Sequence, residues 1–600
     1  MSVELPGLEL ESLRAAYASG EWTPTRLVEA LDEVISAAEP TRIWISRVSR
    51  ERMLEYAREV EARGWEGQPL YGVPFAIKDN IDLAGMPTTA ACPEFAYEPG
   101  ESAFVVRRLM EAGAIPLGKT NLDQFATGLV GVRSPYGFPA NAIDEKYIPG
   151  GSSSGSAVAV ARGFASFALG TDTAGSGRVP AAFNGLVGLK PTRGLLSCRG
   201  VVPACRTLDC VSVFSLSAGD AGAVLDVAAT FDRADAYARA DPGLVEAAPL
   251  GETFTFGVPR EDQLEFFGNG SARGCFAEGV ARMESLGGKR VEIGFGPFLE
   301  AARLLYEGPW VAERYAAIED ILNEKPEILH SVTRGIIEGG GDARAVDAFR
   351  AAYRLQELKR VADEVWEAVD FVMTPTTGTV YTVAEVEAES VKLNSNLGYY
   401  TNFMNLLDYS ALACPAGVME SGMPFGATLF APAFHDGRLL DMAARFGGEK
   451  EVAAVPNEGW TKVVVCGAHM RGLPLNGQLM ERGGRFVAAT RTLPIYRLFA
   501  LPASGELPPR PGLIREDGGG AAVAVEVWVL PTACFGDFVA QIPAPLGIGK
   551  VELEGGEVAP GFLCEGYAVE GAEEITSLGD WRSFVEGSQA RGAIPRCNRD

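Results

Sequence analysis

The stretch from Gly150 to Lys190 most constrains the fold, because two segments rich in glycine and serine flank one short apolar segment. Residues 150–155 read GGSSSG, and residues 171–177 read TDTAGSG. Residues 157–168 between them have the length and alanine content of a buried helix. Glycines let backbone N–H groups approach a ligand closely. The pattern therefore predicts two serine loops facing one pocket, and the apolar middle argues against a flexible glycine–serine linker.

The histidine content restricts the chemistry that these serines can perform. The chain has three histidines, and the first in sequence is His330. A serine needs a base to become a nucleophile, and a lysine whose pKa is lowered by apolar surroundings can serve. Lys78 ends the apolar run 70–77 and is followed by Asp79 and Asn80. This flank favours a buried amine at a strand end over a solvated one.

Lys78, Ser152 and Ser176, in their glycine-rich settings, resemble the amidase-signature family of Ser–cis-Ser–Lys hydrolases. The likeness runs residue by residue through 150–194 and extends upstream through 118–123. It implies an α/β fold in which a mixed β-sheet core is covered by helices.

The resemblance also implies a role for each residue. Ser176 is expected to be the nucleophile, Ser152 to follow a cis peptide bond and relay protons, and Lys78 to be the terminal base. An oxyanion hole is expected from the backbone N–H groups of Thr173, Ala174, Gly175 and Ser176.

Residues 113–120, GAIPLGKT, match the phosphate-loop pattern G-x-x-x-x-G-K-[ST]. That motif binds phosphate only where it follows a strand and opens a helix. Here 104–110 is typical of a helix, and 114–117 of the strand that follows it. The order is reversed, so the sequence predicts no nucleotide site.

Tyr306 and Arg314 are eight residues apart, close to two helical turns, so a single helix would place both on one face. Arginine suits bidentate contact with a carboxylate, although a lone arginine on an exposed helix ordinarily forms a surface ion pair. The Tyr…Arg pattern resembles that of one branch of the family, the allophanate hydrolases. There the pair is implied to bind the carboxylate end of the substrate.

A second domain is predicted to follow the first. Residues 437–459 mix acidic residues, glycine and proline, and a new apolar run begins at Thr461. We expect a catalytic domain over 1–440, a linker over 441–460, a small α+β domain over 461–570 and a tail over 571–600. Segments 467–476, 526–531 and 542–549 resemble the C-terminal domain of allophanate hydrolases, which resembles the γ-glutamyl cyclotransferase fold.

His469 is the candidate catalytic residue of this second domain. A structural role at the end of a strand is the alternative. Relatives carry a histidine after the Leu-Asn pair that matches Leu475 and Asn476, whereas this chain has Gly477. If that histidine acts in the second domain, His469 is the available substitute.

Elsewhere, alternating helical and apolar segments predict α/β layering. Residues 8–64 are expected to be helical. Further helices are expected over 217–245, 276–286, 344–369 and 401–412, with a strand at 372–375.

Composition excludes several classes of partner. The formal net charge of −25 argues against nucleic acid, and it means that an anionic substrate needs a local cation. Ten cysteines without C-x-x-C pairs indicate neither a metal site nor a disulfide framework. The N-terminal residues lack a signal-peptide pattern, and no apolar run reaches the roughly 18 residues of a membrane span. We expect a cytoplasmic enzyme without a cofactor.

The resemblance implies hydrolysis of allophanate (urea-1-carboxylate). The amidase domain would release the first ammonia, and the C-terminal domain would convert N-carboxycarbamate into carbon dioxide and a second ammonia. A homodimer is expected, working with urea carboxylase or with enzymes of biuret or cyanuric acid degradation. Two alternatives stay open: a broad amidase acting on a small neutral amide, and a non-catalytic subunit of the transamidosome type.

Overall fold

The computed structural model forms two compact units, one built from residues 1–242 and 250–451, the other from 243–249 and 452–600. The structure describes residues 5–590 with the exception of 66–67, 243–248, 450–459, 472, 481, 483, 503–509, 517–518, 555 and 557. Each unit has a hydrophobic core of its own.

An 11-stranded sheet organises the first unit, in the order β1-β3-β2-β4-β6-β5-β10-β11-β9-β7-β8. Its strands are β1 (Trp44–Arg47), β2 (Pro74–Lys78), β3 (Ile115–Thr120), β4 (Phe167–Asp172), β5 (Val187–Lys190), β6 (Cys210–Ser215), β7 (Phe254–Pro259), β8 (Gly288–Ile293), β9 (Phe371–Pro375), β10 (Tyr409–Val418) and β11 (Pro424–Pro432). β2 runs parallel to β3 and β4, whereas β4 runs antiparallel to β6. The predicted mixed sheet is confirmed.

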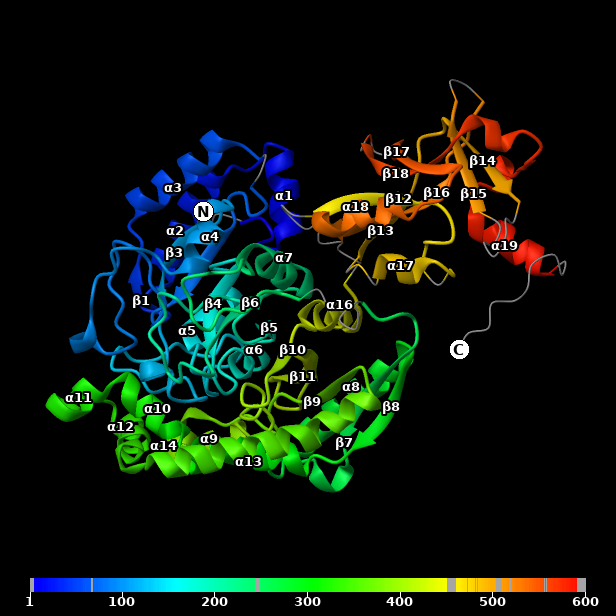
Figure 1. The fold of residues 1–600 in the computed structure, drawn as a ribbon. Helices are drawn as coiled ribbons and strands as arrows, with labels where there is room; N and C mark the ends of the chain where they lie inside the picture. Colours follow the sequence, from blue (N-terminus) through cyan, green and yellow to red (C-terminus); the bar gives the residue numbers. More distant parts are fainter. Residues whose placement is uncertain are drawn as a thin grey trace. The chain divides into compact units, whose positions relative to one another are not determined.

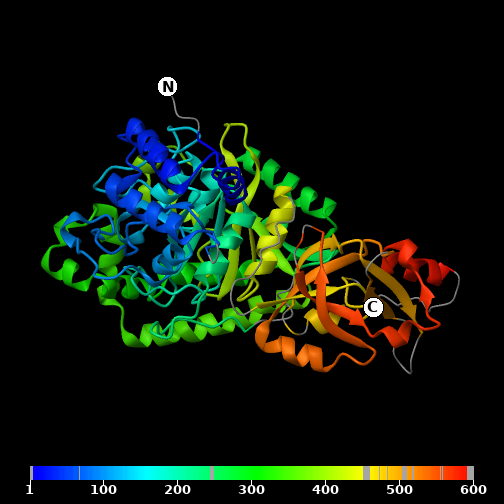
Figure 2. The same cartoon turned by 90° about the horizontal axis from the view of Figure 1, so that it is seen from above.

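Helices surround this sheet (Figures 1 and 2). They are α1 (Leu10–Ala18), α2 (Pro24–Ala38), α3 (Arg50–Arg63), α4 (Phe104–Glu111), α5 (Ser154–Ala161), α6 (Val179–Phe183), α7 (Ala218–Ala228), α8 (Gly270–Ser285), α9 (Gly296–Glu307), α10 (Trp310–Ala317), α11 (Glu319–Glu324), α12 (Ser331–Ile337), α13 (Ala345–Asp363), α14 (Val383–Ala388), α15 (Ser390–Leu397) and α16 (Asp436–Gly447). α9 packs against α13 and α10, and α10 packs against α12. In the described residues, no helix combines the length and apolarity needed to cross a membrane.

The central strands are buried along their whole length. Every residue of β2, β3, β4 and β6 is buried. Continuous apolar runs suit strands covered on both faces, as these are. A polar side chain at the end of such a strand therefore enters a dry environment.

Residues 157–168 are a helix only in part, so the prediction of one helix there is wrong. α5 ends at Ala161, and β4 begins at Phe167. Gly163 ends the helix with φ +67°, a backbone conformation that favours glycine. β4 then pairs with β2 on one side and β6 on the other, and this sheet pairing outweighs the helix propensity of Ala168.

The phosphate-loop match lies in a strand, as predicted. α4 precedes β3, and Gly118, Lys119 and Thr120 belong to β3. Lys119 is buried and forms an ion pair with Asp79 at 3.3 Å. The lysine amine is therefore engaged inside the sheet and not at the start of a helix.

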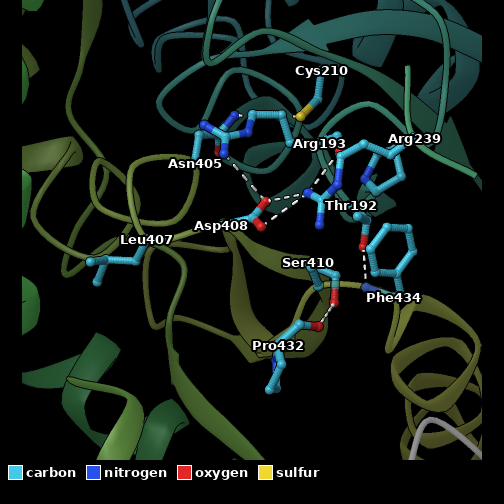
Figure 3. Close-up of polar contacts among 12 residues, drawn as sticks. Thr192, Arg193, Cys210, Arg239, Asn405, Leu407, Asp408, Ser410, Pro432 and Phe434 are labelled. Atoms are coloured by element: carbon cyan, nitrogen blue, oxygen red, sulfur yellow. Dashed lines mark hydrogen bonds and ion pairs between the residues drawn. The ribbon is translucent and has the colours of Figure 1, made fainter. Parts of the chain in front are cut away.

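Residues 401–412 do not form the predicted helix. They run through turns to residue 408 and then enter β10, with Asp408 at φ +58°. The Asn405 amide donates to the carbonyl oxygens of Asp172 (2.8 Å) and Leu208 (2.7 Å). Figure 3 shows Asp408 facing Arg239, to which it is bound at 2.8 Å, with Arg193 also paired to it. These long-range contacts, and not local propensity, fix the segment.

Two further helix predictions differ in extent. The segment expected to be helical over 8–64 is divided by β1. α7 ends at Ala228, and the part of 217–245 that lies at 243–248 is outside the described residues. α8 and α13 lie where helices are expected, and β9 confirms the strand at 372–375.

The second unit is of α+β type. Five strands are ordered β13-β16-β12-β18-β17 and three β15-β14-β19. The strands are β12 (Trp460–Val465), β13 (Arg485–Arg491), β14 (Tyr496–Leu501), β15 (Arg510–Arg515), β16 (Ala524–Pro531), β17 (Leu546–Glu552), β18 (Val558–Cys564) and β19 (Glu573–Glu574), with helices α17 (Asn476–Met480), α18 (Thr532–Ala540) and α19 (Trp581–Ala590). β19 pairs with β14, and Trp581 and Phe584 are buried in this core, so residues 573–584 of the expected tail pack with the unit.

Candidate active site

Lys78 stands at the end of β2 with its side chain fully buried. Its Nζ donates to Ser152 Oγ at 2.8 Å and to Thr171 Oγ1 at 2.7 Å. Ser152 comes from the first glycine–serine loop, and Thr171 comes from β4, the strand beside β2. The structure therefore joins the predicted lysine and one predicted serine, and it adds a threonine that the sequence did not single out.

Burial sets the charge state of this lysine. It lowers the pKa of Lys78 to about 7, although Asp123, Asp172 and Asp209 act to raise it and Arg314 lowers it further. An ordinary lysine titrates about three units higher. Near neutral pH a substantial fraction of the Lys78 amine is therefore unprotonated and able to accept a proton from Ser152.

Close backbone packing shapes the first serine loop. The Gly151–Ser152 peptide bond is cis, as the resemblance implies. The Ser152 carbonyl accepts from the N–H of Asp123 at 3.0 Å. A Cβ at Gly151 would lie 2.2 Å from Asp123 Oδ2, so only glycine fits there.

Asp172 organises the second serine loop. Its buried carboxylate accepts from the N–H groups of Gly175 (2.7 Å) and Gly177 (3.0 Å) and from Arg178 Nε (2.9 Å). Burial acts to raise the pKa of Asp172, but the Arg178 guanidinium and these N–H groups hold it below its ordinary value. The loop therefore turns around a buried, ionised carboxylate.

Ser176 lies at the tip of that turn and is 4% exposed. Its Oγ donates to the carbonyl oxygen of Gly128 in a long contact of 3.5 Å. Of the four N–H groups expected to bind an oxyanion, that of Gly175 is engaged by Asp172. Thr173 donates its hydroxyl to Asp209 at 2.5 Å.

Arg314 and Ser176, the candidate nucleophile, contact neighbouring residues of one loop, Thr127 and Gly128. Arg314 is 3% exposed, and its Nη1 donates to Thr127 Oγ1 at 3.2 Å. Thr127 is the neighbour of Gly128, the residue that accepts from Ser176. The Nε atom of Arg314 has no hydrogen-bond partner among the residues that the structure describes.

Tyr306 and Arg314 do not share one helix, which differs from the expectation drawn from their spacing. Tyr306 lies on α9 and Arg314 lies on α10. Gly308 and Pro309 interrupt the helix between them. The two side chains nevertheless meet, with the guanidinium carbon 5.7 Å from the centre of the tyrosine ring. Two short helices thus achieve the juxtaposition expected of one.

Arg314 keeps its positive charge in spite of its burial. Burial disfavours the charge, yet the pKa of Arg314 is raised because Tyr306, Cys205 and Asp209 stabilise the cation. Burial in turn raises the pKa of Asp209, despite bonds from Thr173 and from backbone N–H groups. A permanent cation with unused N–H capacity suits a ligand carboxylate.

In the second unit, His469 lies beside Gln478 and Phe562. Its Nε2 is 2.9 Å from Gln478 Oε1, and its ring stacks on Phe562 at 5.0 Å between centres. Burial lowers the pKa of His469, although Gln478 acts to raise it, so the imidazole is neutral at pH 7. Gly477, where relatives are expected to have histidine, is exposed on α17.

A protein-family model described as amidase matches residues 26–440. The chain belongs to the amidase family. A second model, described as the allophanate hydrolase C-terminal domain, matches residues 461–586.

Individual relatives of this amidase match different shares of it. Urea amidolyase of Saccharomyces cerevisiae is 42% identical over 602 residues, covering 95% of this chain and 32% of that protein. The chain thus spans about a third of the length of this relative. A glutamyl-tRNA(Gln) amidotransferase subunit from Symbiobacterium thermophilum is 35% identical over 73% of this chain and 95% of that protein.

A solved structure of allophanate hydrolase from Kluyveromyces lactis has 40% sequence identity and a TM-score of 0.78, covering 97% of this chain and 99% of that one. Native peptide amidase from Stenotrophomonas maltophilia has 27% identity and a TM-score of 0.63 over 73% of this chain. The similarity to the first extends through both units.

Proposed function

We propose that this amidase hydrolyses allophanate to ammonia and carbon dioxide. The observation that carries the proposal is the position of Arg314, a buried guanidinium bound to the residue next to the carbonyl that Ser176 contacts. Allophanate is a small amide with one carboxylate. A cation bound to the segment that Ser176 contacts matches that charge. Relatives that span both units support the same reaction.

Lys78, Ser152 and Ser176 carry the first step. The neutral Lys78 amine takes a proton from Ser152, and Ser152 takes one from Ser176. The Ser176 oxygen attacks the carbonyl carbon of the terminal amide, and the backbone N–H groups of Thr173, Ala174 and Ser176, which Asp172 does not engage, stabilise the oxyanion. The leaving nitrogen receives the proton, ammonia departs, and water hydrolyses the acyl enzyme to N-carboxycarbamate.

Arg314 and Tyr306 select the substrate. The guanidinium binds the carboxylate, and the tyrosine ring packs against the guanidinium. A net charge of −25 opposes the approach of an anion, so the local cation is needed for binding. A small neutral amide gains nothing from Arg314, which disfavours the broad-amidase alternative.

The second unit performs the second step. N-carboxycarbamate, a dianion, loses carbon dioxide as its nitrogen gains a proton, and the resulting carbamate breaks down to ammonia and carbon dioxide. We assign the catalysis of this step to the part of the second unit that contains His469. The boundary between the two catalytic parts is placed within residues 441–460.

The cellular setting belongs to the same proposal. The chain works as a homodimer in the cytoplasm and receives allophanate from a urea carboxylase activity or from biuret or cyanuric acid degradation. Similarity to urea amidolyase supports the first source. Cross-linking and sedimentation of the purified chain test the dimer.

Steady-state release of ammonia tests the function. We expect allophanate to be hydrolysed with a kcat/KM far above that of a panel of neutral amides such as biuret, malonamide and indole-3-acetamide. Two ammonia molecules should appear for each allophanate consumed. Equal rates on the neutral amides would instead support the broad amidase, and no amide hydrolysis would support the non-catalytic subunit.

A further inference from the structure

The second unit contains a cavity of about 110 Å³, room for several water-sized groups. Its polar lining comes from His469, Gln478, Arg510 and Gln541. Apolar walls include Leu546 and Phe562. No acidic side chain occurs among the described residues that line it. The cavity therefore combines a cation with a neutral imidazole and apolar walls.

Arg510 is the unusual member of this set. It begins β15 and is 6% exposed. Neither its Nε nor its Nη1 has a hydrogen-bond partner among the residues that the structure describes. A buried charge without a partner is unfavourable unless a ligand of opposite charge completes it. The guanidinium fork matches the two oxygens of a carboxylate.

Close packing between two segments places Arg510 and His469 at the same cavity. A Cβ at Gly467 would lie 2.2 Å from Pro511 Cγ, so the loop that carries His469 is in direct contact with the residue after Arg510. The Asn476 side chain donates to the His469 carbonyl at 2.8 Å and fixes the loop. The site is thus preorganised without a ligand.

We propose that Arg510 is the carboxylate-binding residue of the second unit, holding one end of a small dicarboxylate beside His469. This inference rests on the proposed function, which makes N-carboxycarbamate the ligand. It goes beyond the assignment of His469 as a catalytic residue by naming the residue that binds the ligand and the group that it binds.

The chemistry decides which carboxylate Arg510 holds. In decarboxylation the C–N bond breaks, its electron pair passes to nitrogen, the nitrogen takes a proton from solvent, and carbon dioxide leaves. The departing carboxylate loses its charge, so a cation bound to it would stabilise the reactant more than the transition state. Arg510 therefore binds the carboxylate that stays, and the departing one lies toward the apolar walls.

Malonate is the stable probe for this site, because it has two carboxylates on one central atom, as N-carboxycarbamate does. Calorimetric titration should use the full chain carrying Arg314→Ala, so that the amidase site does not contribute. We expect Arg510→Gln to weaken malonate binding roughly tenfold to a hundredfold, since one charged hydrogen-bonded contact is lost. Arg510→Lys, which keeps the charge and loses the fork, should bind with intermediate affinity.

Arg515→Gln is the matched control. Arg515 lies on the same strand, its side chain is 53% exposed, and it pairs with Glu552 on the surface. Its loss should leave malonate binding unchanged. Equal affinity in Arg510→Gln and Arg515→Gln, or no malonate binding before either change, would overturn the proposal.

Turnover of carbon-13-labelled allophanate, followed by NMR, separates this inference from the function itself. In Arg510→Gln the first ammonia should appear at the wild-type rate while N-carboxycarbamate accumulates. If that variant completes both steps at the wild-type rate, Arg510 has no such role. If the wild-type chain releases no ammonia from allophanate, the proposed function fails, and the malonate titration still decides whether Arg510 binds a carboxylate.

Discussion

Lys78 illustrates how a single residue acquires its chemistry from its position in a sheet. The side chain is fully buried, with the hydroxyls of Ser152 and Thr171 as its hydrogen-bond partners. Burial disfavours the charged amine and lowers its pKa to about 7, while nearby carboxylates limit the fall. A residue that is ordinarily an acid at pH 7 thereby becomes a base.

The pH dependence of activity follows from that value. Lys78 must be neutral to accept a proton, so kcat/KM should rise as the pH passes through about 7 and then level off. Lys78→Ala should lower kcat about a hundredfold to ten-thousandfold, because a general base is removed. Lys359→Ala, a half-buried lysine paired with Asp363, serves as control. A flat profile across pH 7, or a Lys78→Ala chain as active as this control, would refute the role.

The two serines should differ in their effect. Ser176→Ala removes the proposed nucleophile and should abolish ammonia release. Ser152→Ala breaks the proton path but leaves the Ser176 oxygen in place, so a residual rate should persist. Mass spectrometry of the trapped acyl enzyme identifies the modified serine, and an adduct on Ser152 would reverse the assignment.

At the scale of the element, the loop after β4 depends on one carboxylate. Asp172 binds two N–H groups of the loop and the guanidinium of Arg178, and both side chains are fully buried. Within the loop, the Gly175 carbonyl oxygen also accepts from the N–H groups of Arg178 (2.9 Å) and Val179 (2.8 Å). The Asp172 carboxylate adds to this turn by holding the residues on either side of Ser176.

Asp172→Asn tests this arrangement. The amide keeps the shape but leaves Arg178 buried without a counter-charge, which costs about 3–5 kcal/mol of stability. Asp347→Asn breaks the exposed pair with Arg344, and solvent screening of that pair should leave the melting temperature nearly unchanged. Calorimetric melting of both variants gives the comparison, and equal melting temperatures would show that Asp172 does not hold the loop.

The strands β2 and β3 and the lysine–serine pair could be predicted from sequence because their signals are local, whereas the sequence predicts a helix at the start of β4. An apolar run ending in Lys78 indicates a buried strand end, and glycines around Ser152 indicate a tight loop. The exclusion of a phosphate-binding loop also rested on a local signal, since a helix (α4) precedes the strand (β3) that contains Lys119.

The contacts that complete the site could not be predicted, because they join distant segments. Thr171 reaches Lys78 only through the pairing of β4 with β2. The turns at 401–408 are held by side chains that bond to residues about 170 to 230 positions away. Arg510 carries no local pattern, and the lack of partners for its Nε and Nη1 among the described residues is a property of the folded cavity.

At the scale of the whole molecule, two units with separate cores carry two candidate sites. The serine loops and Arg314 belong to the first unit, and the cavity with His469 and Arg510 belongs to the second. Each site is built from residues of its own unit. Either unit can therefore be inactivated without removing the side chains that form the other site.

Mixing two inactivated chains tests this independence. Ser176→Ala leaves the second unit intact, and Arg510→Gln leaves the amidase unit intact. We expect the mixture to release the second ammonia faster than Arg510→Gln alone, because N-carboxycarbamate is small and diffuses between chains. Time courses of ammonia release measure this, and a mixture no faster than Arg510→Gln alone would show that the intermediate does not exchange through solution.

The comparison of allophanate with biuret in Arg314→Ala tests the central claim most directly. Biuret has an amide where allophanate has its carboxylate, so the two substrates differ at the group that Arg314 is proposed to bind. Removing Arg314 also removes a charge that lowers the pKa of Lys78, so both rates should be taken well above pH 7, where the amine is neutral.

Loss of a charged hydrogen bond of about 1.5–3 kcal/mol should lower kcat/KM for allophanate roughly tenfold to more than a hundredfold. The kcat/KM for biuret should stay unchanged or rise. Arg334 is an exposed arginine of α12 that pairs with Glu338, and Arg334→Ala should change kcat/KM for neither substrate. An equal fall for both substrates in Arg314→Ala would contradict the account, because Arg314 would then support the fold and not read the carboxylate.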